Sequence, residues 1–303
     1  GSGLGHKIIW DEVPEGTKAY DPANKLIFST GPLTGTGAVC SGRMTITALA
    51  SWNPYNAVID SHFGGYFGVE LKYAGWDAII VEGKADKPVW LRVEDDKVRV
   101  EDARSMWGKG CFYTIAEITS LMGQDAQAAV IGQAGENLVP ISFIRTGSSH
   151  HGGGHGGVMG SKMLKGIGVR GTRAVHIAGD RAEWVKTMRE NLKIIGANNQ
   201  HGVPNSPQPW AEYTSGTRWT AAKGRFWGAA QPPVETGTCD PKDMNSIGFR
   251  TLKSIFDLGP MAEKYTVRMG GCAACPIRCH SQLVIPELEQ YGFGPSVSST
   301  CVG

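Results

Sequence analysis

The feature that most constrains this chain is a group of three cysteines near its C-terminal end, Cys272, Cys275 and Cys279, with the spacing C-x2-C-x3-C. Such short spacings let one turn of backbone direct several thiolates at a single metal centre, as in proteins that hold a [4Fe–4S] cluster. Two glycines precede the group and two alanines separate its first two members, so backbone N–H groups can approach the cluster sulfurs. The spacing therefore predicts an iron–sulfur cluster.

A zinc site and a chance grouping are the alternatives to an iron–sulfur cluster for these cysteines. A structural zinc site usually has four ligands, and His280, directly after the third cysteine, could be the fourth. Three cysteines in one short segment can also arise by coincidence. For an iron–sulfur cluster the fourth ligand is not evident, because it could be Cys301 or could lie beyond Gly303.

Composition excludes several classes of protein. The net charge is only +2, which gives no reason to expect a nucleic-acid partner. No run of about 18 apolar residues predicts a membrane span. Seven cysteines, an odd number, do not suit a secreted disulfide framework, so a reducing compartment, the cytoplasm, is expected. Glycine, at 42 of 303 residues, is about twice as frequent as in average proteins, which favours tight turns and close approach of backbone to a ligand.

The first part of the chain has the pattern of a β-rich domain. Short apolar or β-branched runs, bounded by Gly, Pro or Asp, predict strands. These runs are Lys25–Ser29, Met44–Leu49, Asp77–Glu82, Val89–Val93, Val98–Val100, Ala128–Gly132 and Gly166–Arg170. One helix is predicted among them, around Tyr113–Met122.

The pattern changes after about residue 178. Apolar side chains at helical spacing predict an amphipathic helix over Arg181–Ile195, with Asp180 as its N-cap. Residues 196–240 are rich in Pro, Gly, Asn and Trp and predict a long ordered loop region. Two further helices are expected, near Phe249–Phe256 and Met261–Tyr265.

These patterns together predict an α+β chain with two domains. The first is a β-rich domain over residues 1–177, and the second, over residues 178–303, is the start of a mostly helical domain that carries the cysteine motif. Because the chain begins with Gly1 rather than Met and stops without a tapering tail, we expect a piece of a longer polypeptide, truncated at the N-terminus and lacking its C-terminal part.

A second unusual stretch runs from Ser148 to Lys162 and has six glycines between residues 152 and 160. Exposed N–H groups in such a loop can hold phosphate or pyrophosphate oxygens, although neither a Walker A loop nor a Rossmann fingerprint is present. His150, His151 and His155 could bind a metal, donate protons to a substrate or bond an anionic cofactor. A surface loop with incidental histidines is the alternative.

Five segments, taken in order, resemble the N-terminal half of the tungsten-containing aldehyde:ferredoxin oxidoreductases, and the resemblance covers essentially the whole chain. The segments are Asn24–Thr36, Gly64–Lys84, Ile131–Val139, Val158–Lys162 and Cys272–Cys279. The resemblance implies a β-sheet base domain that cradles a metal held by two pterin dithiolenes, followed by mostly helical domains.

The same resemblance implies an oxidoreductase. A tungsten or molybdenum bis-pterin centre would exchange electrons with a small organic substrate of the aldehyde or carboxylic acid type. A [4Fe–4S] cluster would pass the electrons to a ferredoxin-like or other iron–sulfur protein. A magnesium ion bridging the pterin phosphates, and either a homo-oligomer or a hetero-oligomer, are compatible with this resemblance.

Three cofactor contacts carry over from the resemblance directly. Arg43 matches an arginine that contacts the pterin, Gly64 matches a pterin-contacting glycine, and His62 stands where the family usually has Asn. These residues are expected to bind the cofactor.

The cofactor-phosphate loop departs from the family pattern. Ser148 and Gly152 stand where the family usually has two arginines, with Ser149 and His151 at the neighbouring contact positions. We expect all four to contact the cofactor and the loop histidines to replace the lost positive charge. Cofactor affinity would then fall as pH rises through about 6–7.

A second departure bears on the reaction. Aldehyde-oxidising members carry a catalytic Glu in a place that aligns here with Val297 or Ser298. In the related tungsten benzoyl-CoA reductases a cysteine in this region ligates the metal, which makes Cys301 a candidate ligand of tungsten or molybdenum, since a soft thiolate suits these metals. A buried, inert thiol is the alternative for Cys301.

Three functions therefore remain open. The first is the aldehyde-type oxidoreductase, with His150, His151 and His155 as the candidate proton donors. The second is a thioester or aromatic acyl-CoA reductase of the same family. The third, of another class, is a zinc-binding structural module.

Overall fold

The structure is a computed structural model that describes residues 1–53, 55, 57–147, 150–195, 264–275, 280–291 and 296–298. The chain divides into two compact units, Gly1–Ile177 and Ala178–Gly303. Within the described residues, no helix is both long and apolar enough to cross a membrane.

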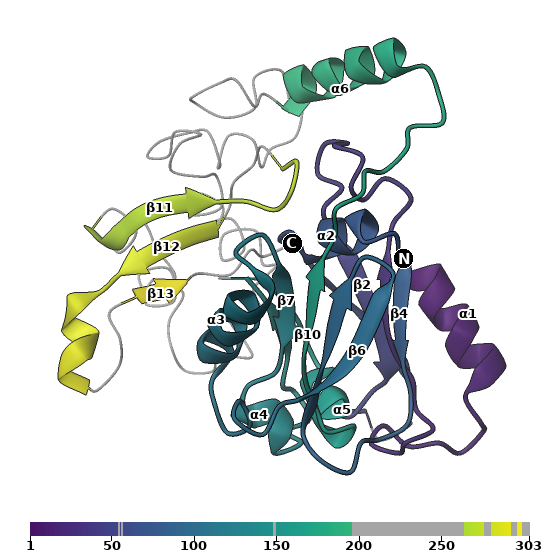
Figure 1. Ribbon diagram of the computed structural model, residues 1–303, viewed down its shortest axis with the longest axis vertical. Coiled ribbons are helices and arrows are strands. Elements are labelled where there is room, and N and C mark those ends of the chain that lie inside the picture. The colour runs from purple at the N-terminus through teal and green to yellow at the C-terminus, as the bar shows by residue number, and fades with distance from the viewer. Residues whose placement is uncertain are drawn as a thin grey trace, which may run out of the picture. The chain divides into compact units, whose positions relative to one another are not determined.

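The first sheet of the first unit has four antiparallel strands in the order β3-β2-β1-β4 (Figure 1). Its strands are β1 (Leu26–Thr30), β2 (Met44–Leu49), β3 (Val58–Phe63) and β4 (Ala78–Val81). Every residue of β1 and β2 is buried, because both sides of these strands are covered. The helix α1 (Ser2–Glu12) packs against one side, and the second sheet packs against the other.

The second sheet has six strands in the order β6-β5-β10-β7-β8-β9. Its strands are β5 (Val89–Glu94), β6 (Lys97–Asp102), β7 (Gln127–Val130), β8 (Ile144–Thr146), β9 (His150–Gly152) and β10 (Leu164–Arg170). The pair β5–β10 is parallel and the other pairs are antiparallel. Four helices accompany these strands: α2 (Phe67–Tyr73), α3 (Cys111–Met122), α4 (Gln133–Glu136) and α5 (Gly156–Ser161).

The core of the first unit lies between the two sheets. Phe28, Phe63 and Phe67 form its aromatic centre, with ring centroids 5.9–6.4 Å apart, a geometry in which each pair contributes about 0.5–1.5 kcal/mol beyond the burial of its area. A second cluster, which includes Trp90, Ile118 and Met122, joins α3 to the outer face of the second sheet. The first cluster includes Ile144 of β8, so this strand is anchored in the core.

The second unit contains the helix α6 (Arg181–Ile195) and a three-stranded antiparallel sheet. Asp180 caps α6, since its Oδ1 accepts the backbone N–H of Glu183 at 2.8 Å. The sheet has the order β11-β12-β13, with β11 (Thr266–Gly270), β12 (His280–Val284) and β13 (Ser296–Ser298); a 3-10 helix, η2 (Pro286–Tyr291), follows β12.

The predicted α+β class is confirmed, and each strand and helix predicted before residue 196 is present with ends shifted by a few residues. Of the expected helix Met261–Tyr265 the structure describes only Lys264 and Tyr265, which are helical. The elements α1, β3, α2, α4, β8, β9 and α5 were not predicted from the sequence, and neither were β11–β13 of the second unit. Those three strands are short and glycine or polar residues interrupt them, so no alternation marks them. The predicted loop region 196–240 and the helix Phe249–Phe256 lie outside the described residues.

Candidate cofactor site

Arg43, His62 and Gly64 come together at one end of the first sheet. Arg43 directly precedes β2, and the antiparallel register pairs Met44 with Phe63, so Arg43 and Gly64 face each other across the same two strands. His62 is half exposed, and its Nδ1 lies 3.0 Å from Oγ1 of Thr45 on the neighbouring strand. The sheet therefore gathers the three residues that the resemblance assigned to the pterin.

The hairpin of β8 and β9 reaches the same place. Thr146, the last residue of β8, donates its hydroxyl to the carbonyl oxygen of Gly64 at 3.3 Å. The register then pairs Thr146 with His150 and Arg145 with His151. Ser148, Ser149 and the side chains of His150 and His151 lie outside the described part of the chain.

Gly152 packs closely against the first sheet. A Cβ at this position would stand 2.6 Å from Cδ1 of Ile46 and 3.0 Å from Oγ of Ser61, both on the first sheet. An arginine, which the resemblance would place here, requires the side chain of Ile46 to move.

His155 is fully buried at the end of the same loop. Its Nδ1 lies 2.8 Å from the carbonyl oxygen of Gly153 and 3.0 Å from Oγ of Ser61, and its Nε2 lies 3.4 Å from the carbonyl oxygen of Ile59. Burial lowers the pKa of His155 to about 4. A neutral, enclosed imidazole is a poor proton donor at neutral pH, and it cannot replace a lost positive charge. The structure therefore favours His155 as the residue that fastens the loop to β3.

This burial predicts an acid-sensitive fold. The pKa of His155 in the fold, about 4, lies below its ordinary value of 6.5, so the unfolded chain takes up a proton first as pH falls. The stability of the fold is complete above about pH 6.5 and decreases by roughly 3 kcal/mol as pH falls to about 4. Urea unfolding at several pH values should show that His155→Gln flattens this part of the profile, whereas His62→Gln, at a half-exposed side chain, should not. Equal acid sensitivity in His155→Gln and the unsubstituted chain would contradict the assignment.

Lys162 is a positioning residue that the sequence indicated only as part of a motif. Its buried Nζ donates to the carbonyl oxygens of Pro22 and Gly83, each at 3.2 Å, and to that of Asn24. Burial lowers the pKa of Lys162 to about 8. It joins two loops of the first sheet to the end of α5, and its only signal in the sequence was its place in the segment Val158–Lys162 that carries the family resemblance.

The cysteine motif lies in a hairpin of the second unit. Gly270 of β11 pairs with His280 of β12, so the connection between them contains the sequence positions of all three cysteines. Cys272 and Cys275 belong to one tight turn, in which the N–H of Cys275 donates to the carbonyl oxygen of Cys272 at 3.1 Å and Ala274 has a φ of 54°. Two thiols on one closed turn fit a cluster that is gripped at neighbouring irons. Cys279 and Cys301 lie outside the described residues.

Val297 and Ser298, the places that align with the catalytic Glu of aldehyde-oxidising members, belong to β13. They pair with Leu283 and Gln282 of β12, the strand that follows the cysteine motif. Neither side chain can replace a carboxylate as a general acid or base.

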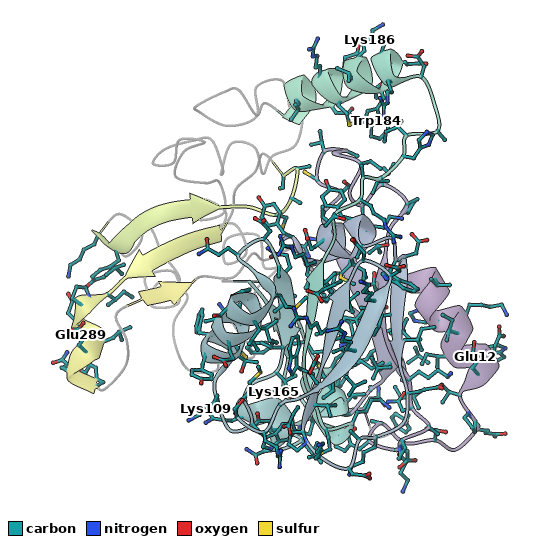
Figure 2. All side chains as sticks on the ribbon, viewed as in Figure 1. Glu12, Lys109, Lys165, Trp184, Lys186 and Glu289 are labelled. Atoms are coloured by element: carbon teal, nitrogen blue, oxygen red, sulfur yellow. The ribbon has the colours of Figure 1, made fainter. Side chains whose placement is uncertain are left out.

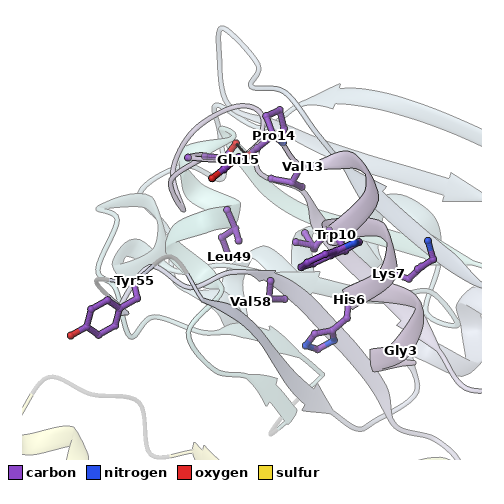
Figure 3. A pocket seen from close by; sticks show the side chains of 13 residues that line it. Gly3, His6, Lys7, Trp10, Val13, Pro14, Glu15, Leu49, Tyr55 and Val58 are labelled. Atoms are coloured by element: carbon purple, nitrogen blue, oxygen red, sulfur yellow. Dashed lines mark hydrogen bonds between the residues drawn. The ribbon is translucent and has the colours of Figure 1, made fainter.

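A hollow of about 960 Å³ lies beside α1 (Figure 3). Trp10, Leu49 and Val58 provide most of its apolar wall, with His6 and Lys7 on the helix. None of the predicted cofactor residues lines it. Its lining contains no set of groups arranged for catalysis, so we assign it no chemistry.

The comparisons with known proteins identify the family to which this chain belongs. Residues 1–171 match the family described as aldehyde ferredoxin oxidoreductase, N-terminal domain. The tungsten-containing aldehyde ferredoxin oxidoreductase of Thermococcus kodakarensis is 41% identical over 94% of this chain and 44% of its own length, and that of Pyrococcus abyssi is 33% identical over 98% and 46%. The chain therefore belongs to the tungsten-containing aldehyde ferredoxin oxidoreductase family.

One solved structure is also similar to this chain over its whole length. A chain of the active-site complex BamBC of benzoyl-coenzyme A reductase, solved with 1,5-dienoyl-CoA, superimposes with a TM-score of 0.77 at 30% identity, over 100% of this chain and 44% of that one. This chain thus spans about half the length of the relatives that it matches. The family predicted from the five sequence segments is confirmed.

Proposed function

We propose that this chain is the cofactor-holding part of an oxidoreductase with a tungsten or molybdenum bis-pterin centre and a [4Fe–4S] cluster. The observation that carries the proposal is the convergence of Arg43, His62 and Gly64 with the β8–β9 hairpin at one end of the first sheet. The centre would exchange electrons with a small organic substrate, and the cluster would pass them singly to a ferredoxin-like partner. The proposal includes a cytoplasmic location and an oligomeric assembly.

The residues of this part of the molecule fit such a centre. Arg43 offers a cationic group, and Gly64, which faces it across β2 and β3, has no side chain to keep a ligand away from the backbone. Ser148, Ser149, Gly152 and His151 would contact the pterins or their phosphates, with a bridging magnesium ion where two phosphates meet. Of the three loop histidines, His150 and His151 are the proposed proton donors, because His155 is enclosed.

The cluster proposal can be tested by colour and iron content. Full-length protein purified without oxygen should be brown and contain iron, and Cys272→Ser or Cys275→Ser should lose most of both. Cys40→Ser is the matched control, because Cys40 is exposed and far from the motif in sequence, and it should stay brown. A colourless protein that contains zinc would support the structural zinc module, with Cys272, Cys275, Cys279 and His280 as ligands, and would end the redox proposal.

A second candidate is a reductase of thioesters or aromatic acyl-CoA compounds. The likeness to a chain of benzoyl-coenzyme A reductase favours it, as does the presence of Val297 and Ser298 in place of a catalytic Glu. In this version Cys301 ligates the metal. Assays with aldehydes and with acyl-CoA compounds separate the two candidates, and Cys301→Ser should release tungsten or molybdenum without removing the cluster iron.

A further inference from the structure

Arg145 is a partly buried cation for which the proposed function has no role. It lies in β8 between Ile144 and Thr146, which are buried against the first sheet. Because side chains alternate along a strand, Arg145 points to the opposite face, toward the start of α3. There its guanidinium carbon lies 4.3 Å from the ring centroid of Phe112.

The guanidinium lacks acceptors along one whole edge. Its Nε and Nη2 are both buried and make no hydrogen bond to any described residue. These two nitrogens present parallel N–H groups, the geometry that receives two oxygens of a carboxylate or phosphate. Burial also lowers the pKa of Arg145, and the charge interaction with the Cys111 thiol offsets only part of this loss of water. A buried charged donor without an acceptor is costly and points to a group that is absent from the chain itself.

No carboxylate of the described neighbourhood is available to fill this edge. The first turn of α3 has no acidic residue, and its N-cap is Gly110, which has no side chain. Glu136 is the one carboxylate that acts on the adjoining Cys111 thiol, and it is already bonded to Lys165 and to the N–H of Gly108. The remaining neighbour, Cys111, is a thiol whose pKa burial raises, so it is mostly uncharged at neutral pH.

We propose that the Nε–Nη2 edge of Arg145 binds an oxyanion of the phosphate or carboxylate class. Phe112 is the side chain that must move to admit it: it lies over the guanidinium, and 57% of its surface is exposed. The ring lies over the face of the guanidinium, so its displacement would give the anion a path to the buried edge. The site is independent of the proposed cofactors, because it lies on the outer face of the second sheet.

Cys111 provides a built-in reporter of the site. The charges of Arg145 and Lys165 lower the pKa of its thiol and Glu136 raises it, against the larger effect of burial. An anion bound to Arg145 offsets part of the positive charge that stabilises the thiolate. The pKa of Cys111 then rises, the thiolate fraction falls and alkylation slows. Each unit by which the thiol pKa rises reduces the thiolate about tenfold at a pH below the pKa.

The experiment measures alkylation of Cys111 by iodoacetamide in the full-length protein, with the modified peptide followed by mass spectrometry. Inorganic phosphate, acetate and adenosine 3′,5′-bisphosphate, the thiol-free phosphate end of coenzyme A, are titrated against chloride at equal ionic strength. We expect at least one oxyanion to slow alkylation about three- to tenfold more than chloride does. If the bisphosphate slows alkylation at a much lower concentration than phosphate does, the bound oxyanion belongs to a nucleotide. If the two act at the same concentration, the bound group is a free anion.

Three variants make the result specific. Arg145→Gln should alkylate slowly from the start and lose the response to anions, whereas Arg99→Gln, which removes the same charge from the exposed strand β6, should behave like the unsubstituted protein. Phe112→Ala should respond at lower anion concentrations. If no oxyanion exceeds chloride in the unsubstituted protein, or if Arg145→Gln keeps the response, the proposal is wrong. The titration of the unsubstituted protein decides the matter even where Arg145→Gln fails to fold.

Discussion

Replacing Lys165 by methionine is expected to destabilise the first unit by about 3–5 kcal/mol, because it leaves a buried carboxylate without its counter-charge. Lys165 is 0% exposed and its partner Glu136 only 4%. Nζ of Lys165 donates to Glu136 Oε1 and to the carbonyl oxygen of Lys109 at 2.8 Å. Both oxygens of Glu136 also accept the N–H of Gly108. Figure 2 labels Lys165 and Lys109 at the same end of the first unit.

The position of Lys165 accounts for the size of the expected effect. It stands in β10, which has β5 on one side and β7 on the other, so neither residue of the pair can turn to solvent without opening the sheet. Urea unfolding followed by circular dichroism measures the change. Lys87→Met is the control, because Lys87 is 60% exposed and 3.8 Å from Asp102, and it should leave stability nearly unchanged. Replacing Lys165 and Glu136 together by methionine should recover part of the loss, and a loss below about 1 kcal/mol in Lys165→Met would contradict the prediction.

Lys165 also shows what strand prediction from sequence can and cannot find. Met44–Leu49 was predicted with its observed ends because every residue is apolar or β-branched and all are buried. The strand around Ile167 was predicted to begin at Gly166, two residues late, because a lysine normally marks the end of a buried strand. The pairing with Glu136, 29 residues away, cannot be read from local pattern. β3 was missed for a related reason: Asp60, Ser61 and His62 follow one another and hide the alternation.

The candidate site was predictable only where a family resemblance supplied it. Arg43, His62 and Gly64 are common residue types that give no signal by themselves. The register of β2 and β3 brings them together. The residues that hold them, Thr45 and Thr146, are common in strands and gave no signal. Chemistry that depends on pairing between strands distant in sequence therefore becomes visible only once the fold is known.

The glycine-rich segment was interpreted from sequence as a loop that cradles phosphate, but part of it is a helix. Residues 156–161 form α5, which packs against α4 at one end of the sheets (Figure 1). Gly160 is where the two backbones come closest, since a Cβ there would overlap with the carbonyl oxygen of Gly135 and stand 2.7 Å from its carbonyl carbon. Close packing, as well as ligand binding, thus accounts for the frequency of glycine in this segment.

Gly160→Ala is expected to destabilise the first unit by about 3 kcal/mol, because the added methyl group meets backbone that cannot change rotamer. Alanine is the better helix former by about 1 kcal/mol, so any loss of stability must come from the overlap and not from the conformation of α5. Gly3→Ala is the matched control: it is also a helical position, in α1, and a Cβ there has no atom within 4 Å.

Both substitutions should be compared by urea unfolding of the same chain. Gly3→Ala should be as stable as the unsubstituted protein or slightly more stable, and Gly160→Ala should unfold at clearly lower urea concentration. The difference between them isolates the contact of Gly160 with Gly135, since the two changes have the same chemistry. If the two variants were equally stable, α4 and α5 would have to separate freely. Lys165 would then lose the fixed position of Glu136, so the tight helix contact and the buried ion pair depend on each other.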